Sequence, residues 1–166
     1  MTPPVFVQGV EQTASAVTHK IGRATSTTTI NDSSSFVNAT GLSFTIGASE
    51  TWAFVTFWEV TTNSTADFKA SLTVPSGASM DYRWSGGFVN NAGSGNFPQS
   101  SNSPMTSADG NMDFQIGGGT KAAGVMSGWV GADTTAGTVQ MRAAQNTATA
   151  VNTVVEIGSY VIAWKV

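Results

Sequence analysis

The chain has 166 residues, a net charge of −3 and no cysteine, and only 10% of its residues are charged, against about a quarter in ordinary domains. This length favours one domain with a sizeable core. The composition excludes disulfides, thiol catalysis and cysteine-type zinc sites, and the lack of a basic run argues against nucleic-acid binding. No apolar stretch suits a membrane span and the N-terminus does not resemble a signal peptide, so we expect synthesis in a cytoplasm.

Residues 1–40 are predicted to be an N-terminal arm or a first strand, and residues 41–166 a β-sandwich domain. Two prolines near the start block a helix, and the apolar residues after them suit an arm that pairs with another sheet edge. A disordered terminus is the alternative. "TSTTTI" (25–30) is compatible with a strand because of its β-branched residues. The arm residues expected to contact a partner are Pro3, Pro4, Val5, Phe6 and Val7.

Regular strand signals begin at "LSFTI" (42–46), where apolar and polar residues alternate. "TWAFVTFWEV" (51–60) is the strongest signal. Apolar residues occupy both of its faces, which predicts a central strand covered on both sides. "FKASLTV" (68–74) alternates in the same way. The following "PSGAS" is predicted to turn the chain, because proline presets φ and glycine tolerates positive φ.

The segment 85–111 is rich in Gly, Ser and Asn and is predicted to be a long loop, a kind of loop that is often functional. Phe88, Phe97 and Met105 lie in it and would form a partner surface if exposed. Two short strands, "MDYRW" and "MDFQI", flank the loop, and "AAGVMSGWVGA" after them is predicted to be a strand with close backbone approach at its glycines. The last run, "NTVVEIGSYVIAWKV", is predicted to be one long closing strand with a bulge at Gly158.

The stretch "GTVQMRAAQN" (137–146) contains good helix formers, yet it also alternates as a strand does. We predict a strand, since a glycine turn precedes it and a strand with which it can pair follows. Arg142 in this stretch is one of only seven basic residues. It is predicted to neutralise Glu59 or Glu156 on a neighbouring strand, or to contact another subunit. In total, about eight strands favour an all-β antiparallel sandwich or jelly roll.

Candidates for catalysis are few. His19 is the only histidine, so a Ser–His pair would have to use it; an exposed or locally hydrogen-bonded histidine is the simpler interpretation. Glu50, Glu59 and Glu156 are conceivable glycosidase carboxylates, but a turn residue and two cross-strand ion pairs explain them more simply. We predict a non-enzymatic protein with no catalytic, cofactor-binding or metal-binding residues.

Two short motifs raise the question of ligands. "DGNMD" (109–113) has oxygen donors at alternate positions, as calcium loops do, but it lacks the distal glutamate of an EF-hand and is also ordinary turn chemistry. "GGGTKAAG" (117–124) has the glycines of a phosphate loop without its motif. The tryptophans are better binding candidates, although such residues in strands are more often core. They are Trp52, Trp58, Trp84, Trp129 and Trp164.

Three stretches also carry a resemblance: "LSFTIGASETWAFVTFWEV", "ADFKASLTVPSGASMDYRW" and "GTVQMRAAQNTATAVNTVVEIGSYVIAWKV". With them, residues 40–166 resemble small all-β virion proteins of tailed bacteriophages. These are capsid decoration (cement) proteins and tail- or fibre-associated modules with a jelly-roll or TNF-like sandwich. The resemblance transfers no catalytic residue.

What the resemblance implies is a structural protein that is made in the host cytoplasm and located in the virion. We expect a homotrimer that binds the major capsid protein or another virion protein, and neither nucleic acid nor a membrane. A face or edge of "TWAFVTFWEV" would then be covered by a neighbouring subunit. The alternative is a tail- or fibre-associated module, or one that binds a carbohydrate or a receptor.

Overall fold

The computed structural model describes residues 18–87, 98–100, 112–114 and 121–166. This part of the chain consists of strands and turns. None of its residues forms a helix that could cross a membrane. The strands are β1 (His19–Arg23), β2 (Thr28–Ile30), β3 (Val37–Ile46), β4 (Thr51–Thr61), β5 (Phe68–Thr73), β6 (Ser79–Gly87), β7 (Pro98–Ser100), β8 (Met112–Phe114), β9 (Lys121–Gly131), β10 (Gly137–Ala144), β11 (Thr153–Val155) and β12 (Tyr160–Lys165).

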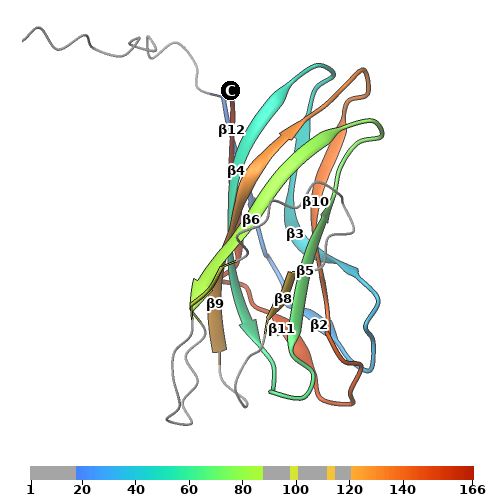
Figure 1. The fold of residues 1–166 in the computed structure, drawn as a ribbon, viewed down its shortest axis with the longest axis vertical. Helices are drawn as coiled ribbons and strands as arrows, with labels where there is room; N and C mark the ends of the chain where they lie inside the picture. The colour runs from blue at the N-terminus through green and yellow to red at the C-terminus, as the bar shows by residue number, and fades with distance from the viewer. Residues whose placement is uncertain (1–17, 88–97, 101–111, 115–120) are drawn as a thin grey trace, which may run out of the picture.

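The strands pair in a nested order. β1 pairs with β12, β2 with β11, β3 with β10, β4 with β9, β5 with β8 and β6 with β7, all antiparallel. One sheet has the order β1-β12-β4-β9-β6-β7, with β11 joining β2 to β4, and the other has the order β3-β10-β5-β8. Figure 1 shows the two sheets face to face. This long hairpin rolled into two sheets is a jelly roll, so the predicted all-β antiparallel sandwich is confirmed, with twelve strands in the described residues instead of about eight.

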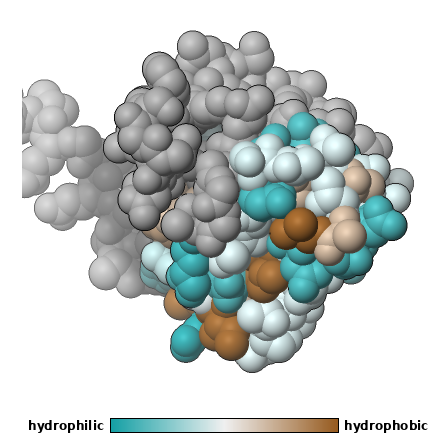
Figure 2. Space-filling view, turned by 90° about the horizontal axis from the view of Figure 1, so that it is seen from below, coloured by the Kyte–Doolittle hydropathy of each residue, from teal (hydrophilic) through white to brown (hydrophobic). Residues whose placement is uncertain are grey.

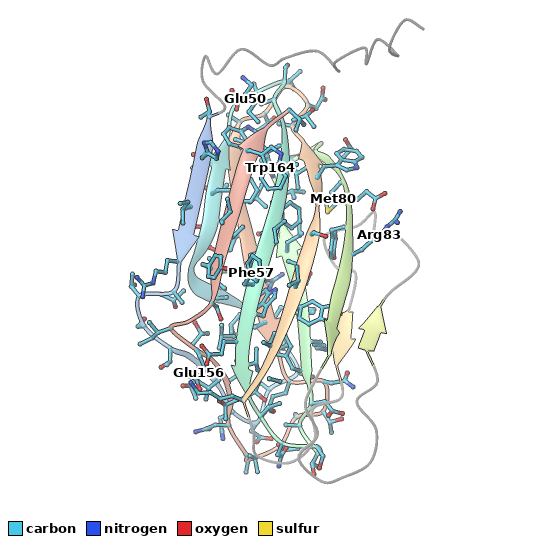
Figure 3. The ribbon with its side chains drawn as sticks, turned by 90° about the vertical axis from the view of Figure 1, so that its left-hand side faces the viewer. Glu50, Phe57, Met80, Arg83, Glu156 and Trp164 are labelled. Atoms are coloured by element: carbon cyan, nitrogen blue, oxygen red, sulfur yellow. The ribbon has the colours of Figure 1, made fainter. Side chains whose placement is uncertain are left out.

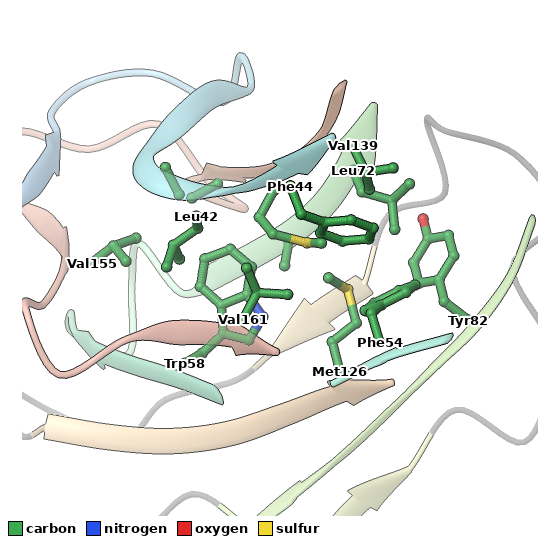
Figure 4. Close-up of a cluster of buried hydrophobic side chains, with 14 of the residues drawn as sticks. Leu42, Phe44, Phe54, Trp58, Leu72, Tyr82, Met126, Val139, Val155 and Val161 are labelled. Carbon is green, nitrogen blue, oxygen red and sulfur yellow. The ribbon is translucent and has the colours of Figure 1, made fainter. Parts of the chain in front are cut away.

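The alternating stretches form strands whose apolar residues point inward. On β4, Trp52, Phe54 and Trp58 are buried, and the strand lies between β9 and β12, as expected of a central strand. Inward residues of β3, β5, β6, β9 and β10 complete one core between the sheets (Figure 4). The predicted turn after β5 is also present, since the Ala78 amide donates to the Pro75 carbonyl and Gly77 has a φ of 78°.

Close backbone approach at the glycines of β9 is confirmed at Gly128, where a Cβ would lie 2.2 Å from the Asp81 carbonyl oxygen of β6. Gly124 points into the core, and a Cβ at this position would lie 1.8 Å from an atom of the Trp84 indole on the neighbouring strand β6. The indole therefore occupies the space that a side chain at 124 would need. This arrangement lets two adjacent strands fill the core with one large side chain.

Three boundaries differ from the expected ones. Residue 40 lies inside β3, and residues 19–40 supply β1, β2 and the first four residues of β3, because these strands complete the edges of both sheets. The expected loop 85–111 includes the hairpin of β6 and β7. The closing run is two strands, β11 and β12, because four residues, 156–159, lie opposite only Trp58 and Glu59 of β4.

Ser159 bridges this interruption. Its hydroxyl accepts a hydrogen bond from the Glu59 amide at 2.9 Å and lies 3.2 Å from the Glu59 carbonyl, to which it can donate. The Glu156 amide donates to the same carbonyl at 2.8 Å. Ser159 is fully buried, so no water can replace its hydroxyl. A side chain thus makes the contacts that a regular strand would make with its backbone.

We predict that Ser159→Ala lowers the free energy of unfolding by about 1–3 kcal/mol, because it leaves a buried amide of β4 without an acceptor. Urea denaturation followed by tryptophan fluorescence measures this change. The matched control is Ser26→Ala, which removes an exposed hydroxyl from a bend and should change stability by less than about 0.5 kcal/mol. Equal effects of the two substitutions would contradict the bridging role of Ser159.

Candidate interaction surface

The outer face of the eight-stranded sheet is apolar at its centre. Side chains that point away from the core on four adjacent strands form this surface, which we call the apolar face (Figure 3). Ile21 is 71% exposed, Trp129 40% and Phe57 36%, although a sheet face directed at solvent is ordinarily polar. The apolar face consists of Ile21 on β1, Tyr160, Ile162 and Trp164 on β12, Ala53, Val55 and Phe57 on β4, and Val125 and Trp129 on β9.

Strand register arranges these side chains in rows across the sheet. In the middle row, Ile21 lies opposite Ile162, which lies opposite Val55. In the row below, the rings of Phe57 and Tyr160 stack, with centroids 4.6 Å apart and planes 25° from parallel. Aromatic and aliphatic cross-strand pairs of this kind stabilise the sheet.

The outer face of the other sheet is different. Its outward residues on β3, β10 and β5 are polar, as expected where a sheet is directed at solvent. They are Ser43, Thr45, Thr138, Gln140, Arg142, Lys69 and Thr73. The described part of the lower end of the sandwich, seen in Figure 2, carries hydrophobic residues only as separate spots among hydrophilic and neutral ones. Of these surfaces, only the outer face of the eight-stranded sheet has an apolar centre that extends across several strands, and Ser127 of β9 is the polar residue in its middle row.

Ion pairs lie around the apolar face and not within it. Glu59 and Lys121 pair at 2.9 Å at its lower end, and Asp81 and Arg83 approach to 3.9 Å on the β6 side. The Glu59 carboxylate also raises the pKa of Lys121 by accepting its hydrogen bond. These exposed pairs contribute little to stability. They do neutralise most of the charge next to the apolar face.

A third pair closes the upper end of the sandwich. The Glu50 carboxylate accepts hydrogen bonds from Lys165 Nζ at 2.8 Å, the Gly47 amide at 2.7 Å and Trp52 Nε1 at 2.9 Å. These donors, with Lys165 first, lower the pKa of Glu50 from 4.5 to about 2. Glu50 therefore connects the β3–β4 turn, the core tryptophan of β4 and the last strand.

Of the catalytic candidates, the structure brings only Glu59 and Glu156 together, since the Glu156 amide donates to the Glu59 carbonyl at 2.8 Å. His19 is exposed on β1, whereas Glu59 and Glu156 lie at the lower end of the sheet. Glu59 pairs with Lys121 on the adjacent strand β9, which confirms its predicted cross-strand ion pair. Glu156 accepts a hydrogen bond from the Thr61 hydroxyl at 2.6 Å. In the described part of the chain, no three potential ligands gather in a way that could hold a metal ion.

The predicted pairing of Arg142 with Glu59 or Glu156 is wrong. Arg142 lies on β10 in the four-stranded sheet, whereas both glutamates belong to the other sheet or its turns. Its guanidinium donates to the Phe36 carbonyl at 2.8 Å and lies 5.5 Å from the centroid of the Phe36 ring. The strand predicted for this stretch is confirmed as β10. The alternative role of Arg142 in a subunit contact stays a prediction.

Most other predicted partner residues lie outside the described residues, namely Pro3, Pro4, Val5, Phe6 and Val7 in the arm and Phe88, Phe97 and Met105 in the 85–111 segment. The motif "DGNMD" lies largely outside them as well. Of the tryptophans, Trp52, Trp58 and Trp84 are core residues, whereas Trp129 and Trp164 belong to the apolar face. The sequence reasoning did not single out Ile21, Ile162 or Tyr160. The stretch "YVIAWKV" has apolar residues on both faces, and this pattern could have indicated that Tyr160 and Ile162 lie on an apolar outer surface.

No protein-family model, curated protein or solved structure matches this chain. Functional inference therefore depends on the surface itself.

Acid should destabilise the protein through Glu50. Because its pKa is lowered to about 2 in the folded state, the stabilisation is complete above the unfolded pKa of about 4.5 and is lost as the pH falls towards 2. We predict that Glu50→Gln is less stable than the wild type at pH 7 and that the two stabilities converge near pH 2. Thermal melts between pH 2 and pH 7 measure this difference. Lys165→Met should also reduce the loss of stability between pH 7 and pH 2. Parallel stability profiles of Glu50→Gln and the wild type over this pH range would refute the role of Glu50.

Proposed function

We propose that the protein is a non-enzymatic structural component of a phage virion, and specifically a capsid decoration protein that binds the capsid lattice as a homotrimer. The observation that carries this proposal is the contrast between the two outer faces of the sandwich. The face of β3, β10 and β5 is polar, whereas the face of β1, β12, β4 and β9 is apolar. Contiguous exposed apolar patches of this kind on a compact domain are often functional.

The size of the apolar face suggests how it is used. Four adjacent strands and three rows of side chains cover on the order of 300 Å², given strand spacings of about 4.8 Å and a rise of about 3.4 Å per residue. A stable interface buries about 800 Å² on each partner. The apolar face is thus the centre of a larger contact that includes the polar residues around it, as interfaces with an apolar core and a polar rim do.

The charges around this surface favour recognition by shape. Asp81 pairs with Arg83 and Glu59 with Lys121, so neither sign dominates near the apolar face. Long-range electrostatic attraction then contributes little to association. This suits a protein that occupies many identical lattice sites, where repeated weak contacts add up. A tail or fibre position is the close alternative, and the copy number per virion separates the two: hundreds indicate the capsid and a handful indicate the tail.

We expect the purified protein to sediment as a trimer, to bind purified empty capsids and to raise their melting temperature. Ile21→Asp should weaken capsid binding at least about tenfold, because it places a charge in an interface that excludes water. Ile21 is 71% exposed in the single chain, so the variant should keep the fold of the wild-type protein. Binding is measured by co-sedimentation and the capsid melt by calorimetry.

Thr138→Asp is the matched control, because Thr138 is exposed on the polar outer face of β10 and receives the same new charge. Raising the NaCl concentration should leave wild-type binding nearly unchanged, since apolar burial is not screened by salt. Capsids that neither bind the protein nor melt at a higher temperature would refute the capsid placement. Equal losses for Ile21→Asp and Thr138→Asp would refute the role of the apolar face.

A further inference from the structure

The upper row of the apolar face consists of two tryptophans with a small side chain between them. Trp164 on β12 and Trp129 on β9 lie on either side of Ala53 on the central strand β4. Two of the five tryptophans therefore share one row at the surface, and the other three are buried. Between them stands one of the smallest side chains, so nothing tall interrupts the row.

Strand geometry sets the spacing of the two indoles. The strands β12 and β9 are both neighbours of β4, and their axes are therefore about 10 Å apart. This distance is comparable to the length of a disaccharide. The Trp129 ring also extends along its own strand, since an atom of the ring lies 3.5 Å from the position of a Cβ at Gly131.

Polar groups flank the same row at both ends. His19 lies opposite Trp164, and Asp81 lies opposite Trp129. Arg83, one row below and 58% exposed, approaches Asp81 at 3.9 Å. Imidazole, carboxylate and guanidinium groups together supply both hydrogen-bond donors and acceptors. The row thus combines apolar ring surfaces with hydrogen-bonding groups at its ends, as sites that orient a small ligand do.

We propose that Trp129 and Trp164 form a platform that binds a neutral, extended oligosaccharide. The apolar faces of two pyranose rings would stack on the two indoles, and their hydroxyl groups would bond to His19, Asp81 and Arg83. Bases of single-stranded nucleic acid also stack on aromatic rings, but they need a cationic track for the backbone. Here Arg83 is paired with an aspartate and the chain has a net charge of −3, which favours an uncharged ligand.

This binding role goes beyond the proposed structural role and does not depend on it. The Phe57–Tyr160 stack lies four residues along β4 from the tryptophan row, or about 13 Å away. Because both tryptophans belong to the apolar face, a partner that covers the whole face and an oligosaccharide would compete for the upper row. In Figure 3, Trp164 lies near the upper end of the sheet and Phe57 near its middle.

The test uses a glycan array to find the sugar class and then titrates the full-length protein with soluble hexasaccharides of β-1,4-linked glucose and N-acetylglucosamine. Tryptophan fluorescence and calorimetry measure binding. Trp129→Ala and Trp164→Ala should each weaken binding at least about tenfold, because each removes an aromatic anchor. Trp129→Phe should retain part of the affinity, since it keeps a ring. Circular dichroism confirms that each variant is folded.

Ile21→Asp separates this proposal from the proposed structural role, because it should weaken capsid binding and leave the titration with a soluble hexasaccharide unchanged. Three results would overturn the platform: no binding on the array or in the titrations, tryptophan variants that bind sugar as the wild type does, or tryptophan variants that lose trimer or capsid contacts while no sugar is bound. In the last case the row belongs to a protein interface.

Discussion

The nested pairing of strands is the constraint on which the rest of this structure depends. Each pair from β1–β12 inward to β6–β7 closes around the next, so the two ends of the described chain must meet before the outer pairs can form. Closing such long loops costs chain entropy. The central strand β4 offsets this cost, because it pairs with β9 over its whole length and with both β11 and β12 on its other edge.

Side chains replace the backbone ladder where this pairing is interrupted. Ser159 spans the gap between β11 and β12 through two contacts to Glu59. Gln145, which is fully buried, does the same for the β10–β11 connection. Its Oε1 accepts from the amides of Ser33 and Thr149, and its Nε2 donates to the Val151 carbonyl. The side-chain oxygen and nitrogen of Gln145 and the hydroxyl of Ser159 are buried at little cost because each of them has a hydrogen-bond partner.

Local alternation predicted the strands that carry the core, because a strand with one buried face has a two-residue period whatever its neighbours are. Partners were harder to predict, since they depend on which sheet a strand joins. Arg142 illustrates this: its strand was predicted correctly, but β10 joins β3 and β5, far from Glu59. The three-residue strand β11 was not separated from β12, because the alternation of apolar residues continues through the interruption at 156–159. The outer apolar residues were only partly foreseen, because periodicity shows that both faces of β4 are apolar but not which face meets the core.

The charged residues near the apolar face lie at its edge and not at its centre. A jelly roll needs an apolar interior, which Trp52, Phe54 and Trp58 already fill from β4. The apolar residues on the opposite face of the same sheet are therefore not required to close the core, and exposing them lowers solubility. Ion pairs occupy the edge of that face at Glu59–Lys121 and Asp81–Arg83, and its centre is left uncharged. Charges that served solubility alone would be spread over the exposed centre, and their exclusion from it is the feature on which the proposed interaction surface rests.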